Sequence, residues 1–151
     1  MAITRLQLEN ELVSRRKAML EAVGILSTPA GYPDLNSPIA YAIRQSGGTV
    51  SNLSSVVDAD LATVDAEDYD KLMDVAEYRL LMNIKGRWAK VDISSGPYRQ
   101  SLGQFADQLD KDIAAMKTQL QEEHGFGGAS YSIEAGVIDL NFAQSDPDES
   151  L

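Results

Sequence analysis

The residues whose type best suits cation binding lie in one acidic stretch of the chain. Between positions 58 and 74 it holds seven carboxylates: Asp58, Asp60, Asp65, Glu67, Asp68, Asp70 and Asp74. Asp58-Ala-Asp60 begins like a calcium-binding EF-hand loop, but the sixth position is Thr63 where the motif needs Gly, and the twelfth is Tyr69 where it needs Glu. The stretch is therefore interpreted as negative charge at a helix start, where the helix dipole favours it. A metal-dependent enzyme that uses Asp60 or Asp68 is the third-ranked alternative.

Nucleophilic and thiol chemistry has little support in the composition. The chain has no cysteine and one histidine, His124, which excludes disulfides, cysteine-zinc sites, iron–sulfur clusters and thiol nucleophiles. No nucleophile stands beside His124, and its expected place is the C-terminal end of a long helix, where the dipole favours a cation. Gly125-Phe-Gly-Gly follows a helix and lacks a trailing Lys-Ser/Thr, so it predicts a helix end and not a phosphate loop. The sequence thus assigns no catalytic residue, no metal ligand and no cofactor.

A basic strip interleaved with aromatic residues is the second candidate site. The chain as a whole carries 23 acidic and 13 basic residues, a net charge of −10, which disfavours wrapping nucleic acid. Against this background, cations gather over residues 79–99 with Asp92 alone opposing them. Such a strip could touch a phosphate backbone, but self-association or plain exposure is the favoured interpretation. The subunit-interface candidates are Arg79, Lys85, Arg87, Trp88, Lys90 and Arg99.

The elements that must position these residues are mostly helices. Apolar residues that recur every three or four positions predict helices at 4–23, 37–45, 65–86 and 98–124. Residues 27–35 read as a loop, 87–97 as a connector, and 49–57 as a loop, a short strand or the lead-in to a helix near 58–61. The predicted fold is mainly α, a small helical bundle with one long helix in the C-terminal half.

Single residues indicate where these predicted helices begin, end and pack. Thr4 and Asp65 are expected to cap helix N-termini, and Gly24 and Gly86 to end helices. In the long helix, Gly103 is a candidate for the close approach of another helix. A narrow apolar seam runs along the same helix through Leu102, Phe105, Leu109, Ile113, Met116 and Leu120.

One face of the first helix is charged. It carries Glu11 and the run Arg15, Arg16 and Lys17. The favoured interpretation is a solvated face, and contact with an acidic neighbour is the alternative.

The C-terminal segment has a different character. Ile138, Leu140 and Phe142 alternate with polar residues, which is typical of a strand with one buried face. Because lone strands and hairpins are marginal in water, the segment is expected to complete a sheet with another chain or to add a strand to a partner. A hairpin over 130–142 on its own helices is an equal alternative. The scheme therefore has a helical domain at 1–128 and, at 129–151, a short β-hairpin or strand with a flexible acidic tail.

Several stretches resemble head-to-tail connector (adaptor) proteins of long-tailed bacteriophages. They are Asp74-Val-Ala-Glu-Tyr-Arg-Leu-Leu, Val91-Asp-Ile, Arg99-Gln-Ser-Leu-Gly-Gln-Phe-Ala-Asp-Gln-Leu and Ala135-Gly-Val-Ile-Asp-Leu-Asn-Phe. The early Gly31-Tyr-Pro-Asp, followed by a short helix and a glycine pair, fits the same plan. The likeness covers roughly residues 39–142 and lies in pattern and order, with no catalytic motif to carry over.

The resemblance implies a structural virion protein and not an enzyme. Such a protein forms a ring, commonly of twelve copies, in the neck between the capsid portal and the tail, and extends the DNA channel. The implied partners are the portal protein, other copies of the chain, the next neck or tail-completion protein and DNA in transit. No membrane partner is expected, and assembly would take place in the host cytoplasm. The basic strip then becomes a candidate for the channel lining.

The resemblance also gives the C-terminal segment a role as an arm that docks on the portal or another partner. The residues expected to make that contact are Tyr131, Ile133, Val137, Ile138, Leu140 and Phe142. The alternative function is a helical partner-binding module without ring assembly, which would place the apolar seam of residues 98–120 in a partner's groove.

Overall fold

The computed structural model describes residues 2–89 and 99–127. This part of the chain folds into a small bundle of α-helices with one long helix in its C-terminal half, as predicted. Its elements are α1 (Arg5–Ala22), the 3-10 turn η1 (Pro33–Leu35), α2 (Asn36–Gln45), α3 (Asp58–Leu61), the 3-10 turn η2 (Ala66–Asp68), α4 (Tyr69–Trp88) and α5 (Arg99–His124). The predicted strand at residues 130–142 and the connector from residue 90 onward lie outside the described residues.

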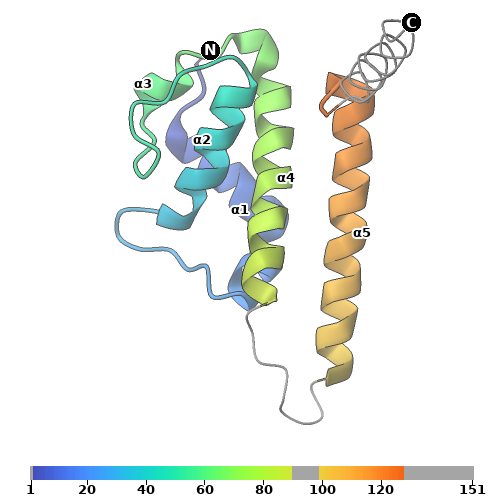
Figure 1. Cartoon of the computed structure of the whole chain (residues 1–151). Helices are drawn as coiled ribbons and strands as arrows, with labels where there is room; N and C mark the ends of the chain where they lie inside the picture. The colour runs from blue at the N-terminus through green and yellow to red at the C-terminus, as the bar shows by residue number, and fades with distance from the viewer. Residues whose placement is uncertain (1, 90–98, 128–151) are drawn as a thin grey trace, which may run out of the picture.

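α4 is the central element of the bundle. α1, α2 and α5 all contact it, and α2 and α5 lie on opposite sides of it. α1 passes behind α4 in the view of Figure 1. α5 runs beside α4 in the opposite direction, so its C-terminal end lies near the beginning of α4.

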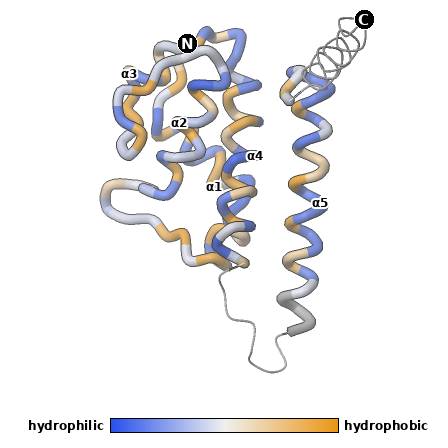
Figure 2. Tube along the Cα trace, viewed as in Figure 1, coloured by the Kyte–Doolittle hydropathy of each residue, from blue (hydrophilic) through white to orange (hydrophobic). Residues whose placement is uncertain are grey.

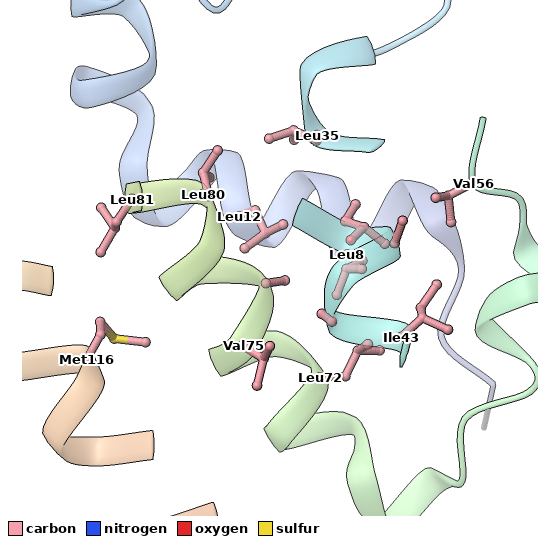
Figure 3. Packing of buried hydrophobic residues seen from close by; sticks show 14 of the residues in the cluster. Leu8, Leu12, Leu35, Ile43, Val56, Leu72, Val75, Leu80, Leu81 and Met116 are labelled. Atoms are coloured by element: carbon pink, nitrogen blue, oxygen red, sulfur yellow. The ribbon is translucent and has the colours of Figure 1, made fainter. Parts of the chain in front are cut away.

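The main part of the core lies where α1 and α2 pack against α4. Leu8 and Leu12 of α1, Ile43 of α2, and Leu72 and Val75 of α4 are fully buried and point into one cluster (Figure 3). α5 adds a second apolar contact, since Leu109, Met116 and Leu120 of the predicted seam are buried. Figure 2 shows hydrophobic and hydrophilic positions alternating along α5, as expected for a helix with one packed face.

The predicted helix boundaries are partly correct. Thr4 caps α1 as predicted: its hydroxyl accepts a hydrogen bond from the Gln7 amide at 3.2 Å, and the Gln7 side chain accepts one from the Thr4 amide at 3.0 Å. Gly24 follows α1 with a φ of +73°, a conformation that favours glycine.

The boundaries of the α4 region differ from the prediction. Asp65 makes no capping hydrogen bond, and a 3-10 turn precedes α4, which begins at Tyr69. The helix also continues through Gly86 to Trp88, because Trp88 is held by packing: its ring lies 4.4 Å from that of Phe105, centroid to centroid. Gly103 marks no close approach, since a Cβ atom built there would meet no described atom within 4 Å.

None of the helices in the described ranges combines the length and the apolar character needed to cross a membrane.

Candidate functional site

Two different faces of α4 carry the candidate functional residues: one faces α5, and the other lines an open groove beside α2. One face turns toward α5 and consists of Asp74, Tyr78, Leu81, Lys85 and Trp88. Another face lines hollows beside α2 and consists of Arg79, Met82, Asn83 and Gly86. The first set has steps of three or four residues, and in the second set Met82 and Asn83 each lie three or four residues from Arg79 and from Gly86, which places the members of each set on one side of the helix.

A buried carboxylate, Glu77, joins α1 to α4. It is 4% exposed, and two consecutive arginines reach it. Arg15 Nη1 lies 2.9 Å from Glu77 Oε2, and Arg16 Nε lies 2.7 Å from Glu77 Oε1. The hydrogen bond to Glu77 raises the pKa of Arg15 above its ordinary value. Arg16 also reaches α5, where its Nη1 lies 2.7 Å from Asp112 Oδ2, so one cluster joins three helices.

A break in α1 lets both arginines share one partner. Consecutive residues of a regular helix point about 100° apart. At Arg16 the backbone leaves the helical region, with φ −129° and ψ 20°, inside α1. The alternative, contact with an acidic neighbour, is therefore correct for Arg15 and Arg16, and the solvated interpretation is wrong for Arg16, whose side chain is 18% exposed, while Arg15 stays 39% exposed. Lys17 is 72% exposed and matches the solvated interpretation.

His124 ends α5, as predicted, and its ring lies against α4. His124 Nε2 is 3.1 Å from Asp74 Oδ2 and 4.0 Å from Glu123 Oε2. These three residues have ligand atoms within 4.8 Å of one another and could hold a cation. Arg15 Nη1 lies 4.0 Å from the other oxygen of Asp74, so this carboxylate has the guanidinium of Arg15 on one side and the His124 ring on the other. Nothing in the sequence pattern pointed to a pairing of Asp74 with a histidine fifty positions away.

The acidic stretch at residues 58–74 does not gather into one site. Asp58 and Asp60 lie in the first turn of α3 and Asp70 in that of α4, in agreement with charge at helix starts. Among the described residues, the carboxylates of positions 58–70 form no group of three at ligating distance.

Asp60 instead organises the loop at residues 49–57. Its carboxylate accepts hydrogen bonds from the Val57 amide at 3.0 Å, the Ser51 amide at 3.0 Å and the Ser51 hydroxyl at 2.8 Å. These bonds, that of the Val57 amide foremost, lower the pKa of Asp60 below its ordinary value. The loop held in this way carries Leu53, an exposed residue at the groove beside α2.

The predicted basic strip is split between the two sides of α4. Lys85 Nζ lies 2.6 Å from Asp110 of α5, and Trp88 packs on α5 as well. On the other side, Arg87 pairs with Asp34 of η1. Arg79 also lies on this side, with its guanidinium carbon 4.9 Å from the centre of the Tyr41 ring of α2. Lys90 and the side chain of Arg99 lie outside the described residues, as do the arm residues 131–142.

The surface between α2 and α4 holds two adjoining hollows of about 550 Å³ and 180 Å³ that share Ser37 and Leu53. Together they are called the α2–α4 groove. Its apolar part is Leu53, 50% exposed, and Met82, 38% exposed. Its other end holds Arg44 and Arg79, which form no ion pair with any described residue. The Arg79 Nε is buried and has no hydrogen-bond partner among residues 2–89 and 99–127.

The α2–α4 groove and the contacts that join α5 to α1 and α4 thus belong to a mainly helical bundle. Comparisons of the chain with protein-family models, with curated proteins and with solved structures found no match.

Proposed function

We propose that this chain is a structural protein of a bacteriophage particle that forms a ring between the capsid portal and the tail. Two lines of support lead to it. One is the resemblance of residues 39–142 to phage connector proteins. The other is the way in which α5 is fastened to the rest of the subunit.

α5 is held from Phe105 to its C-terminal end, and this observation carries the proposal. The helix has 26 residues and is about 39 Å long at 1.5 Å per residue. Four contacts fasten it to the body over residues 105–124: Trp88 with Phe105, Lys85 with Asp110, Arg16 with Asp112, and Asp74 with His124. The chain therefore leaves the body at a fixed point, after Gly127. A ring subunit needs such a rigid body together with an arm that starts from a defined place, and residues 131–142 are that arm in this proposal.

A ring requires two unlike surfaces on each subunit, because neighbours meet head to tail. The α2–α4 groove and the α5 side lie on opposite sides of α4, so the two faces of the subunit differ in shape and in chemistry. In the assembled neck, the partners are other copies of the chain, the portal protein and the next neck or tail-completion protein, with DNA passing through the channel.

The test is made on phage particles. Negative-stain images of particles produced without the protein are expected to show DNA-filled heads without tails, and restoring it is expected to restore the necks. In solution, the full chain is expected to co-migrate with the portal of the same phage, and the chain cut after Gly128 to do so less. Normal necks in particles that lack the protein would refute the proposal.

The alternative function, a partner-binding module without ring assembly, is constrained by α5. The seam that it would offer to a partner's groove is occupied, since Leu109, Met116 and Leu120 are buried in this chain's own core. A stable heterodimer with no higher assembly would favour this alternative, and its partner would have to use another surface or displace α5.

A further inference from the structure

We propose that the α2–α4 groove binds the C-terminal segment, residues 131–151, of a second copy of the chain. This inference rests on the proposed ring and names the contact between neighbouring subunits. It is carried by the chemistry of the groove, by the charge of the segment and by the place where the segment begins.

The groove calls for a ligand that is both apolar and acidic. Leu53 and Met82 expose apolar surface in a hollow of about 550 Å³. Arg44 and Arg79 border the adjoining hollow without an ion pair among the described residues, although the whole chain carries 23 acidic residues. Because a buried donor without a partner is unfavourable, the unpaired Arg79 Nε marks a guanidinium that is incompletely satisfied within the body.

The C-terminal segment has this combination of properties. Residues 128–151 contain five acidic residues and no basic one, so they carry half of the net charge of −10. The same segment alternates Ile138, Leu140 and Phe142 with Asp139 and Asn141. An extended chain with this pattern presents apolar side chains on one face and a carboxylate on the other, which suits a groove with an apolar part and an arginine pair beside it.

The geometry favours a segment from a neighbour. α5 lies on the far side of α4 from α2, and it ends beside Asp74, near the beginning of α4. The groove extends along α4 to Gly86 and Arg87, near its other end. The segment of the same chain would have to turn back across the body to enter the groove, whereas a neighbouring copy placed at the α2 side could enter directly. Repetition of this head-to-tail contact from copy to copy generates a ring when the rotation between neighbours closes.

Because the chain has no cysteine, engineered thiols are the only thiols present in a disulfide-trapping experiment. The variants Leu53→Cys and Leu140→Cys are prepared as separate full-length chains with tags of different size, mixed and oxidised. We expect mixed dimers to form at least ten times faster than from Leu6→Cys and Leu140→Cys. Leu6 is a matched control, because it is 64% exposed and lies on α1 at a different hollow. Equal rates for the two pairs would overturn the proposal.

A double variant with both Leu53→Cys and Leu140→Cys in one chain separates a neighbour from self-binding. Disulfide-linked multimers are expected, and a product that consists of internally bridged monomers at every protein concentration would overturn the assignment to a second copy. Changing Arg44 and Arg79 together to Gln is expected to slow the mixed trapping at least five-fold. The matched removal of two charges, Lys111→Gln together with Lys117→Gln at exposed positions of α5, is expected to leave the rate unchanged. Equal slowing by both changes would show general charge attraction and overturn the role of the groove.

The same trapping in assembled particles keeps this inference distinct from the proposed function. Necks that depend on the protein but give Leu53–Leu140 trapping no faster than the Leu6 control would refute the groove contact and leave the ring standing. In that case the segment would be free to bind the portal. Rapid trapping in solution, together with normal necks in particles that lack the protein, would refute the ring and leave the contact between copies.

Discussion

Replacing Glu77 with glutamine is expected to lower the free energy of unfolding by about 2–3 kcal/mol. The change keeps the shape of the side chain but removes the charge that Arg15 and Arg16 share at 2.9 Å and 2.7 Å. Both arginines would then face a neutral amide at the junction of α1 with α4.

The magnitude follows from the burial of each partner. Removing one member of a buried ion pair costs about 3–5 kcal/mol, because a charge is left without compensation. Here each arginine keeps a second carboxylate, Glu11 at 2.9 Å for Arg15 and Asp112 at 2.7 Å for Arg16. The Arg15 side chain is also 39% exposed, so water compensates part of its loss. Because of the second carboxylates and the exposure of Arg15, the expected loss of about 2–3 kcal/mol lies below the value of about 3–5 kcal/mol that is typical of a broken buried ion pair.

The measurement is urea unfolding of the full chain, extrapolated linearly to water. The matched control is Glu11→Gln, which removes the same charge from the same Arg15 at a side chain that is 49% exposed, and which should cost less than about 0.5 kcal/mol. Trp88 is the only tryptophan and packs against Phe105, so its fluorescence also reports whether α5 stays docked. An effect of Glu77→Gln no larger than that of Glu11→Gln would refute the argument that burial makes this cluster strong.

Three further changes test other parts of the structure by the same unfolding measurement. Gly31→Ala is expected to lower the free energy of unfolding by more than about 1 kcal/mol, because the φ of Gly31 is +98° and the new Cβ would lie 2.8 Å from a Glu9 oxygen. Gly103→Ala is the control at an open helical site, and it should raise the free energy of unfolding by up to about 1 kcal/mol. Asp60 has a lowered pKa in the folded chain, so its contribution is present above its ordinary value of 3.8 and is lost as the pH falls through the lower folded value. Asp60→Asn should therefore be less stable than the natural chain near neutral pH and should flatten the acid limb of the stability profile; an unchanged profile would contradict this. Leu120→Ala, at a fully buried position, should cost about 2–5 kcal/mol, and a loss below 1 kcal/mol would contradict the docking of α5.

The helices were predictable because their information is local. A stripe of apolar residues with a period near 3.6 identifies a helix and its buried face without knowledge of the partner. For this reason the seam positions Leu109, Met116 and Leu120 were correct, as was the cap at Thr4. The end of α4 was not, because a contact between Trp88 and Phe105 outweighs the local tendency of Gly86 to stop a helix.

The polar contacts were less predictable, since they depend on which helix faces meet. The sequence showed that Arg15 and Arg16 are cations, but it did not show that a break in α1 turns both toward Glu77, more than sixty positions away. The basic strip failed as a single surface for a related reason. Residues of α4 that are neighbours in sequence lie on different sides of the helix, so Lys85 contacts α5 while Arg87 contacts η1.

The central position of α4 makes the length of this helix as important as its composition. Inserting one residue near its middle would rotate every later side chain by about 100° about the helix axis. Arg79 and Met82 would then leave the surface beside α2, while Lys85 and Trp88 would lose their partners on α5. We therefore expect drift in this protein to proceed by substitution within α4, while gains and losses of residues are confined to its loops.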